Sequence, residues 1–403
     1  MLTLIRIILL IAFLVALIRL RLNLALALII DSIFAGILFR MNLLALLKVF
    51  PLTLSQTTTL EFLGIIYLVL LLGEILQATG SLTRVIHSLE KLFKDYRVSI
   101  AVIPALIGLL PMPAGAMLSA PLVKECGIQR GLTAEMMTHI NFWFRHIWEY
   151  FWPLYQGILL TAGIFKVPIR DIMITQAPLS LFAIAAGVFF MLRIPSDHNH
   201  KAKADFGQIG RVLFYIWPVL LVILLVLIVK MRMVYALGIS ALGALAVSGL
   251  SLKSVLGLFK KSFSISTLGV IYSVFLFKNI TELSGALKMM PAISSGPAIV
   301  KLAAIFIAPF LVGFLTGVNS AFVGITFPVI APLMTGNGVN LSYVMFAYAG
   351  GFAGVLLSPI HLCLCLTKEY YGALYPKVYR YLLPSVLFML AGSVLLLFLY
   401  SLK

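Results

Sequence analysis

The sequence is poor in charge and in cysteine. Only 11% of its 403 residues are charged, and 13 are acidic. Soluble domains carry about 25% charged residues, so this composition excludes an ordinary water-soluble protein. The three cysteines, Cys126, Cys363 and Cys365, show no C-x-x-C spacing, and we interpret them as packing residues.

Motifs of enzymes and of metal sites are missing as well. The sequence contains no HExxH, no P-loop and no GxSxG, and its six histidines show no metal-ligand spacing. We therefore expect no enzyme, no cofactor and no metal centre. The net charge of +17 comes from scattered loop residues, which favours contact with anionic membrane lipids over a nucleic-acid partner.

Apolar runs dominate instead, since 62% of the residues are hydrophobic. Runs of about 20 residues can cross a hydrocarbon core about 30 Å thick. The sequence predicts an all-α polytopic membrane protein. Its ten candidate crossings are residues 3–20, 22–39, 60–80, 132–163, 173–193, 211–229, 233–250, 266–286, 341–367 and 380–400.

Two further apolar stretches, 98–123 and 298–333, contain helix breakers at 109–115 and 315–320. Each half is expected to be too short to cross. We interpret both stretches as re-entrant hairpins.

An internal repeat relates the two hairpins. LGIIY at 63–67 recurs as LGVIY at 268–272. At the same offset of 205 residues, Gly108 aligns with Gly313. With a shift of one residue in this alignment, Pro153 aligns with Pro359. A duplicated unit of this length is no solenoid repeat.

The predicted organisation is a first repeat at 1–195, a polar linker at 196–210 and a second repeat at 211–403. Each repeat reads as five crossings plus one hairpin, with a short amphipathic segment after the third span. Five is odd, so the second repeat is expected to be inverted, as in many secondary transporters.

Orientation follows from the basic residues of the loops. One side carries eighteen Lys and Arg residues and the other carries ten. The positive-inside rule makes the richer side cytoplasmic, so both termini are expected outside the cell (inner) membrane.

The hairpin tips are the first candidate binding site, because exposed helix ends there favour anions and freed carbonyls can hold Na⁺. The alternative is that the tip residues only form turns. The candidates are Pro111, Pro113, Gly115 and Ser119 in the first hairpin and Thr316, Gly317, Asn319, Ser320 and Thr326 in the second.

The interrupted spans are the second candidate, at 141–153 and 348–361. Arg145 is either a substrate-anion ligand or the partner of Glu149, four residues away. His146 is a candidate proton carrier. Asn141 and, in the second repeat, Ser358 complete this group.

Acidic residues within spans are candidates for ion coupling. Glu74 of the first repeat aligns with Asn279 of the second. A carboxylate in one repeat and an amide in the other suggest a proton or cation site in the first repeat only. Asp31 is either a relay or a residue at a water-filled crevice. Lys278 and Glu282 are expected to form a structural i, i+4 pair.

The segments LLPMPAGAMLSAPLV at 109–123 and GFLTGVNSAFVGITFPVIAPL at 313–333 resemble an uncharacterised bacterial and archaeal membrane protein family grouped with the ion-transporter superfamily. Its characterised branches include gluconate, citrate, dicarboxylate and arsenite carriers. The resemblance implies scaffold and transport domains, opposed hairpins, a homodimer and elevator-type alternating access. In the dicarboxylate branch each hairpin tip has a Ser-Asn-Thr type motif. Asn319-Ser320 of the second hairpin is similar to this motif, whereas the first tip has the sequence Pro-Met-Pro-Ala-Gly instead.

Together these features predict a secondary active transporter of a small organic anion, a symporter coupled to protons or Na⁺. Two alternatives remain. The aromatic run around Arg145 suggests a lipid-linked phosphate translocase, and the membrane setting suggests an enzyme acting on a lipid or isoprenoid substrate.

Overall fold

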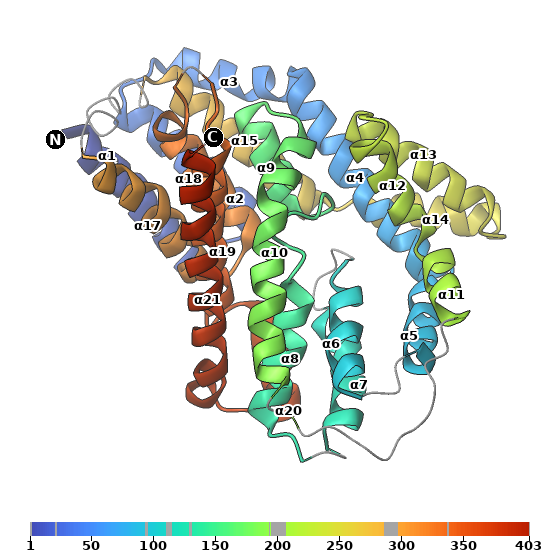
Figure 1. Cartoon of the computed structure of the whole chain (residues 1–403). Helices are drawn as coiled ribbons and strands as arrows, with labels where there is room; N and C mark the ends of the chain where they lie inside the picture. The colour runs from blue at the N-terminus through green and yellow to red at the C-terminus, as the bar shows by residue number, and fades with distance from the viewer. Residues whose placement is uncertain are drawn as a thin grey trace.

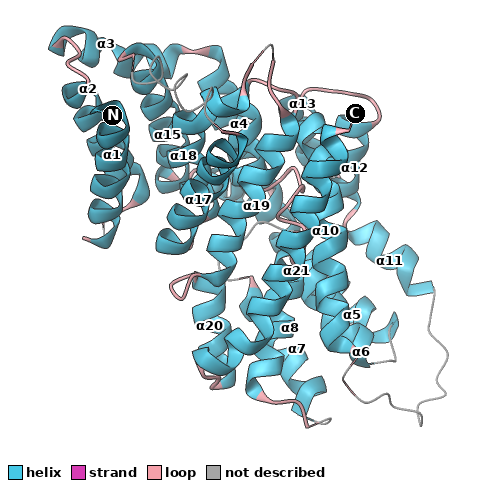
Figure 2. Ribbon diagram, turned by 60° about the vertical axis from the view of Figure 1, so that its left-hand side comes forward, coloured by secondary structure: helices cyan, strands magenta, loops and turns pink. Residues whose placement is uncertain are grey.

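The computed structural model describes residues 2–20, 22–92, 96–109, 115–128, 131–192, 194, 207–285, 297–336 and 338–402. Within these ranges the chain is helical, and an isolated bridge between Thr335 and Val339 is the only β-type pairing. The helices form an elongated bundle, with α1 at one end and α5 and α11 at the other (Figures 1 and 2).

Ten helices precede the polar linker. They are α1 (Leu2–Arg19), α2 (Leu24–Leu38), α3 (Leu43–Ser55), α4 (Thr57–Ala78), α5 (Ser81–Leu92), α6 (Tyr96–Ile107), α7 (Ala116–Ile128), α8 (Ala134–His146), α9 (Gln156–Phe165) and α10 (Ile169–Met191).

The described helices after the linker follow the same order. They are α11 (Gly207–Tyr215), α12 (Trp217–Leu227), α13 (Met233–Ala246), α14 (Leu252–Ser262), α15 (Ile265–Leu283), α17 (Ala298–Thr316), α18 (Asn319–Met334), α19 (Leu341–Leu357), α20 (Leu362–Tyr371) and α21 (Tyr375–Ser401). Most of the linker, up to residue 206, lies outside the described residues, and α11 begins at Gly207.

The chain is a multi-pass membrane protein. Five described helical segments are long and apolar enough to cross a bilayer: α4, α10, α17, α19 with α20, and α21. The bent pairs α11 with α12 and α14 with α15 raise this number to seven. Each of the ten predicted crossings coincides with a helix or a broken helix pair, although α2 and α13 have only 15 and 14 residues.

One sequence expectation about a helix length is wrong. The first arm of the second hairpin, α17, has 19 residues and is long enough to cross, because Pro309 is accommodated inside the helix and the chain breaks only after Thr316. The stretches 43–55 and 252–262, which lie outside the predicted crossings, form two further helices, α3 and α14. The amphipathic helix expected after the third span is present as α5.

Helix starts are specified at matching places in the two halves. The side chain of Asn42 accepts a hydrogen bond from the Leu44 amide before α3, and that of Ser251 accepts from Ser254 before α14. Thr133 and Asn340 cap α8 and α19 in the same way. Such side chains satisfy amide groups that a helix leaves unpaired at its first turn.

Contacts between the halves occur in exchanged pairs. Helix α2 packs against α15 while α13 packs against α4, and α3 packs against α15 while α14 packs against α4. Farther along, α7 contacts α20 while α18 contacts α9, and α8 contacts α21 while α10 contacts α19. Each of these contacts therefore has a counterpart in which the halves change places.

These contacts divide the bundle into two groups of helices. One group contains α1–α5 with α11–α15, and the other contains α6–α10 with α17–α21. Helices α18 and α19 lie at the centre of the second group, and every residue of α19 from Val344 to Leu357 is buried. A helix that is apolar on all sides suits a position inside a bundle.

Candidate functional site

Three interruptions of helices meet inside the second group. Helix α8 ends at His146 and α9 begins at Gln156, α17 gives way to α18 after Thr316, and α19 gives way to α20 after Leu357. We call their meeting point the junction: residues 145–155, 317–319 and 358–363 together with Tyr348. Non-helical backbone at membrane depth is tolerated where protein or a water-filled cavity surrounds it.

Arg145 is the buried cation of the junction, with 2% of its surface exposed. Its Nη1 donates a hydrogen bond of 2.7 Å to the hydroxyl of Tyr155, and this hydroxyl donates to the carbonyl of Gly108 at the end of α6. Glu149 Oε1 lies 3.9 Å from Nη1. Helix α8 ends at His146, so Glu149 lies in the non-helical segment after it. The pair of Arg145 and Glu149 is therefore not formed along one continuous helical face.

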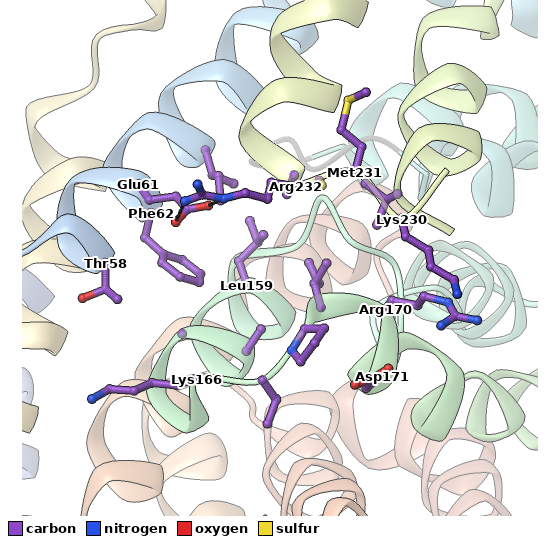
Figure 3. A pocket seen from close by; sticks show the side chains of 18 residues that line it. Thr58, Glu61, Phe62, Leu159, Lys166, Arg170, Asp171, Lys230, Met231 and Arg232 are labelled. Carbon is purple, nitrogen blue, oxygen red and sulfur yellow. Dashed lines mark hydrogen bonds and ion pairs between the residues drawn. The ribbon is translucent and has the colours of Figure 1, made fainter. Parts of the chain in front are cut away.

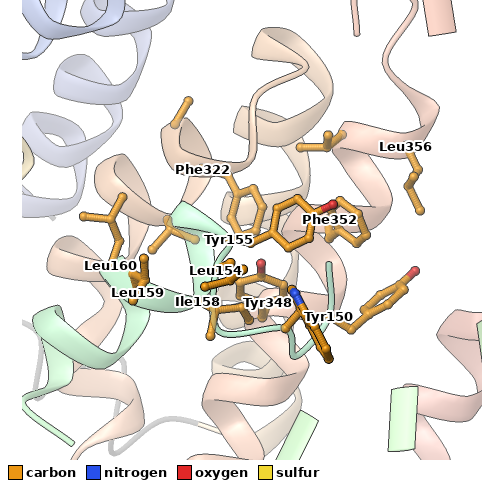
Figure 4. Close-up of a cluster of buried hydrophobic side chains, with 14 of the residues drawn as sticks. Tyr150, Leu154, Tyr155, Ile158, Leu159, Leu160, Phe322, Tyr348, Phe352 and Leu356 are labelled. Atoms are coloured by element: carbon orange, nitrogen blue, oxygen red, sulfur yellow. The ribbon is translucent and has the colours of Figure 1, made fainter. Parts of the chain in front are cut away.

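Glu149 connects the first interruption to the second hairpin. Asn319 Nδ2 donates to Glu149 Oε2 at 3.2 Å, and the hydroxyl of Tyr348 donates to the Glu149 carbonyl at 2.9 Å. Figure 4 shows Tyr348 and Tyr155 in one buried cluster, with Phe322 and Phe352 beside Tyr348. The carboxylate thus has one oxygen held by Asn319 and the other directed toward Arg145.

The third interruption brings His361 against His146. Their Nε2 atoms lie 3.1 Å apart. His361 Nδ1 lies 2.7 Å from the carbonyl oxygen of Gly317, which has the left-handed φ of 64° that ends α17. The ligand atoms of His146, His361 and Cys363 all lie within 4.8 Å of one another.

The aromatic run of the first interruption satisfies backbone groups. The indole of Trp148 donates to the carbonyl of Ala105 at 2.7 Å, and that of Trp152 donates to Leu109 at 2.8 Å. These carbonyls belong to the last turn of α6 and the residues after it, where a helix leaves acceptors without partners. Trp148 and Trp152, two residues of the run that suggested a lipid-linked substrate, therefore satisfy backbone acceptors of the first hairpin.

A cavity of about 640 Å³ lies between α4, the α9–α10 turn and the α12–α13 turn (Figure 3). Its charged lining consists of Lys166, Arg170, Lys230 and Arg232 with Glu61 and Asp171. Arg232 is paired with Glu61 at 2.6 Å, so basic charge remains in excess. The cavity also reaches Leu159, one helical turn from Tyr155.

The structure brings several predicted residues together at the junction: Arg145, His146, Glu149, Gly317, Asn319 and Ser358. Ser358 is buried, and its hydroxyl has no partner within the described part of the chain. Ser320 follows Asn319 in the first turn of α18 and is buried.

Other predicted residues have local roles. The hydroxyls of Ser119, Thr316 and Thr326 donate to carbonyls of their own helices. Asn141 donates to the carbonyl of Ala116 at 2.9 Å and so ties α8 to the start of α7 beside Gly115. Pro111 and Pro113 lie outside the described residues.

The acidic candidates in α2 and α4 have no contact with the junction. Glu74 is half-buried and forms an ion pair of 2.7 Å with Lys261, so it is not the buried acid that the sequence predicts. Asp31 is fully buried, and neither carboxylate oxygen has a partner among the described residues. Lys278 and Glu282 form the expected pair at 3.0 Å.

Sequence reasoning missed His361, Tyr155, Tyr348 and Cys363 as members of the site. The repeat contains a signal for two of them, because the register that pairs Pro153 with Pro359 also pairs Tyr155 with His361. In the structure each of these side chains contacts a carbonyl at the end of a first hairpin arm, Gly108 for Tyr155 and Gly317 for His361.

The fold and the junction define a helical multi-pass membrane protein with interrupted helices at its centre. The chain belongs to the family described as "Protein of unknown function (DUF401)", which matches residues 3–399. A comparison with curated proteins found no match.

Proposed function

We propose that this protein is a secondary transporter that binds a small anion at the junction. The observation that carries the proposal is the convergence of three helix interruptions on the buried guanidinium of Arg145. An ionisable residue inside a membrane bundle is costly to keep and marks substrate or ion pathways. Helix ends at membrane depth are the usual binding elements of secondary transporters.

An inverted repeat is part of this proposal and is supported by matched side chains. Tyr67 of α4 donates to the carbonyl of Phe259 in α14, and its repeat partner Tyr272 of α15 donates to Phe50 in α3. Each tyrosine therefore contacts the other half, as a two-fold relation requires. Gly108 and Gly313, also repeat partners, both allow a hairpin arm to approach a backbone carbonyl of the interrupted helix.

The two groups of helices suggest how access would alternate. The group of α1–α5 with α11–α15 serves as the scaffold, and the group of α6–α10 with α17–α21 contains the junction and moves. Only a few helix pairs contact one another across the boundary, among them α15 with α18 and α4 with α9. A sparse boundary favours the sliding of one group past the other, as in an elevator mechanism.

The basic cavity supports an anionic substrate. It lies at this boundary, because α4, α12 and α13 belong to the scaffold group and α9 and α10 to the other group. Clefts lined by charge of one sign raise the local concentration of ions of the opposite sign. Leu159 of α9 lines the cavity and lies one turn from Tyr155, so α9 connects the cavity to the junction.

Uptake by proteoliposomes tests the proposal. The purified full chain is reconstituted and supplied with labelled succinate, citrate, gluconate and inorganic phosphate, each with an imposed proton gradient, an imposed Na⁺ gradient or neither. We expect gradient-dependent accumulation of at least one of these anions above protein-free liposomes. Accumulation of none of them under any gradient would contradict the proposal.

A further inference from the structure

The two histidines of the junction are held in one tautomer. His146 Nδ1 lies 2.6 Å from the carbonyl oxygen of Phe142, and His361 Nδ1 lies 2.7 Å from that of Gly317. A carbonyl oxygen only accepts hydrogen bonds, so each Nδ1 carries the proton. In a neutral imidazole the Nε2 atom is then an acceptor with a lone pair.

These two acceptors face each other at 3.1 Å. Two lone pairs at this separation repel unless a cation lies between or beside them. Further donors are close, because Cys363 Sγ completes a group whose ligand atoms all lie within 4.8 Å, and Glu149 Oε1 lies 3.7 Å from His146 Nε2. Nitrogen, sulfur and oxygen donors thus lie close to the two facing nitrogen atoms.

We propose that His146, His361 and Cys363 bind one divalent transition-metal ion. Nitrogen–metal distances of about 2.0–2.1 Å in a tetrahedral site place two histidine nitrogens about 3.3 Å apart, close to the separation found here. Metal-binding histidines usually donate their second ring nitrogen to a carbonyl, as both do in this protein. A ligand set of imidazole and thiolate selects Zn²⁺, Co²⁺, Ni²⁺ or copper over Mg²⁺ or Ca²⁺.

Three protein ligands leave a fourth position open, which either Glu149 or an external ligand would fill. The thiolate of Cys363 and the carboxylate of Glu149 balance a divalent charge, and Arg145 then adds a net positive charge beside the open position. Such a site links the first and third interruptions directly. The inference concerns binding alone and does not depend on the proposed transport activity.

Cobalt binding to the purified full chain tests the inference. The protein in detergent is stripped with a chelator, titrated with Co²⁺ and followed by absorption spectroscopy. We expect one equivalent of Co²⁺ with a thiolate-to-cobalt charge-transfer band, and displacement by Zn²⁺. The same addition of Zn²⁺ should raise the thermal unfolding temperature, because a ligand that binds the folded state stabilises it.

Two cysteine variants separate the site from general thiol binding. Cys363→Ser should lose the charge-transfer band, whereas Cys365→Ser should keep it, since Cys365 Sγ instead contacts the carbonyl of Pro359. His361→Gln should weaken Co²⁺ binding by at least about tenfold. If the two nitrogens only share a proton, the wild-type chain would bind no Co²⁺, and this result would overturn the inference. A charge-transfer band that survives in Cys363→Ser would do so as well.

Discussion

His146 and His361 face each other through their Nε2 atoms at 3.1 Å, although 215 positions separate them in the chain. The first lies at the end of α8 and the second directly before α20, so their contact joins the interrupted spans of the two halves. The hydrogen bonds of Arg145, Glu149 and Asn319 surround this contact.

The end of α17 requires glycine for two reasons. Gly317 has a φ of 64°, and a Cβ atom there would lie 2.9 Å from the backbone of His361. Gly372 has a φ of 71° with open space around it. We expect Gly372→Ala to destabilise the protein by about 1 kcal/mol and Gly317→Ala by clearly more, as measured by thermal unfolding in detergent. An equal loss of stability in both variants would show that the close approach of the His361 backbone does not restrict residue 317.

The hydroxyl of Tyr155 bridges Arg145 and the carbonyl of Gly108. Tyr155→Phe leaves this buried carbonyl without that donor, so we expect a loss of about 1–3 kcal/mol in unfolding free energy. Tyr150→Phe is the matched control, because the buried hydroxyl of Tyr150 has no partner among the described residues. The control variant should unfold at the wild-type temperature, and a comparable loss in both variants would refute the bridging role.

The inverted repeat predicts that equivalent turns of the two halves face opposite sides of the membrane. Lys166, between α9 and α10, and Leu374, between α20 and α21, are both exposed. In a background without native cysteines, Lys166→Cys should react with an impermeant maleimide from outside the cell. Leu374→Cys should react only after the membrane is opened. Labelling of both from one side contradicts the inversion.

Asp31 stays a candidate for coupling, because it is fully buried and its carboxylate has no partner among the described residues. A lone ionised carboxylate inside a membrane bundle is unfavourable, so a proton or a cation neutralises it. Asp31→Asn mimics the neutral form and should abolish the gradient dependence of uptake while exchange of substrate persists. Glu74→Gln, which removes the charge of an acid already paired with Lys261, should leave both activities unchanged. The reverse pattern would restore Glu74 as the coupling residue.

Much of the fold was predictable from local pattern. The sequence predicts interruptions within 141–153 and 348–361, and the structure has breaks after His146 and after Leu357. Helices α3 and α14 are shorter than a bilayer crossing, so a search for long apolar runs does not find them, and α14 also contains three lysines. The break after α17 was placed correctly, but the length of its first arm was not.

The junction was only half predictable, because its contacts join residues distant in sequence. A buried Arg145 and its pairing with Glu149 follow from spacing within one segment, whereas His361 and Cys363 meet His146 only through the packing of α8 against α20. The expectation that the histidines and cysteines form no metal site rested on spacing alone. Gly317 is a predicted binding residue of the hairpin tip, but the backbone of His361 occupies the space beside it.

In the proposed function the buried charge of Arg145 binds the transported anion. Removing only one partner of a buried ion pair destabilises a protein, so the decisive variant neutralises both, Arg145→Gln with Glu149→Gln. Its matched control is Lys278→Gln with Glu282→Gln. This variant neutralises an ion pair of the same i, i+4 spacing that lies in α15, away from the junction.

The measurement is uptake of the anion that the wild-type chain accumulates, in liposomes reconstituted with equal amounts of each folded variant. We expect a loss of at least about tenfold for Arg145→Gln with Glu149→Gln and uptake near the wild-type rate for the Lys278 and Glu282 control. Wild-type uptake by the Arg145 and Glu149 variant would show that this charge does not bind the anion.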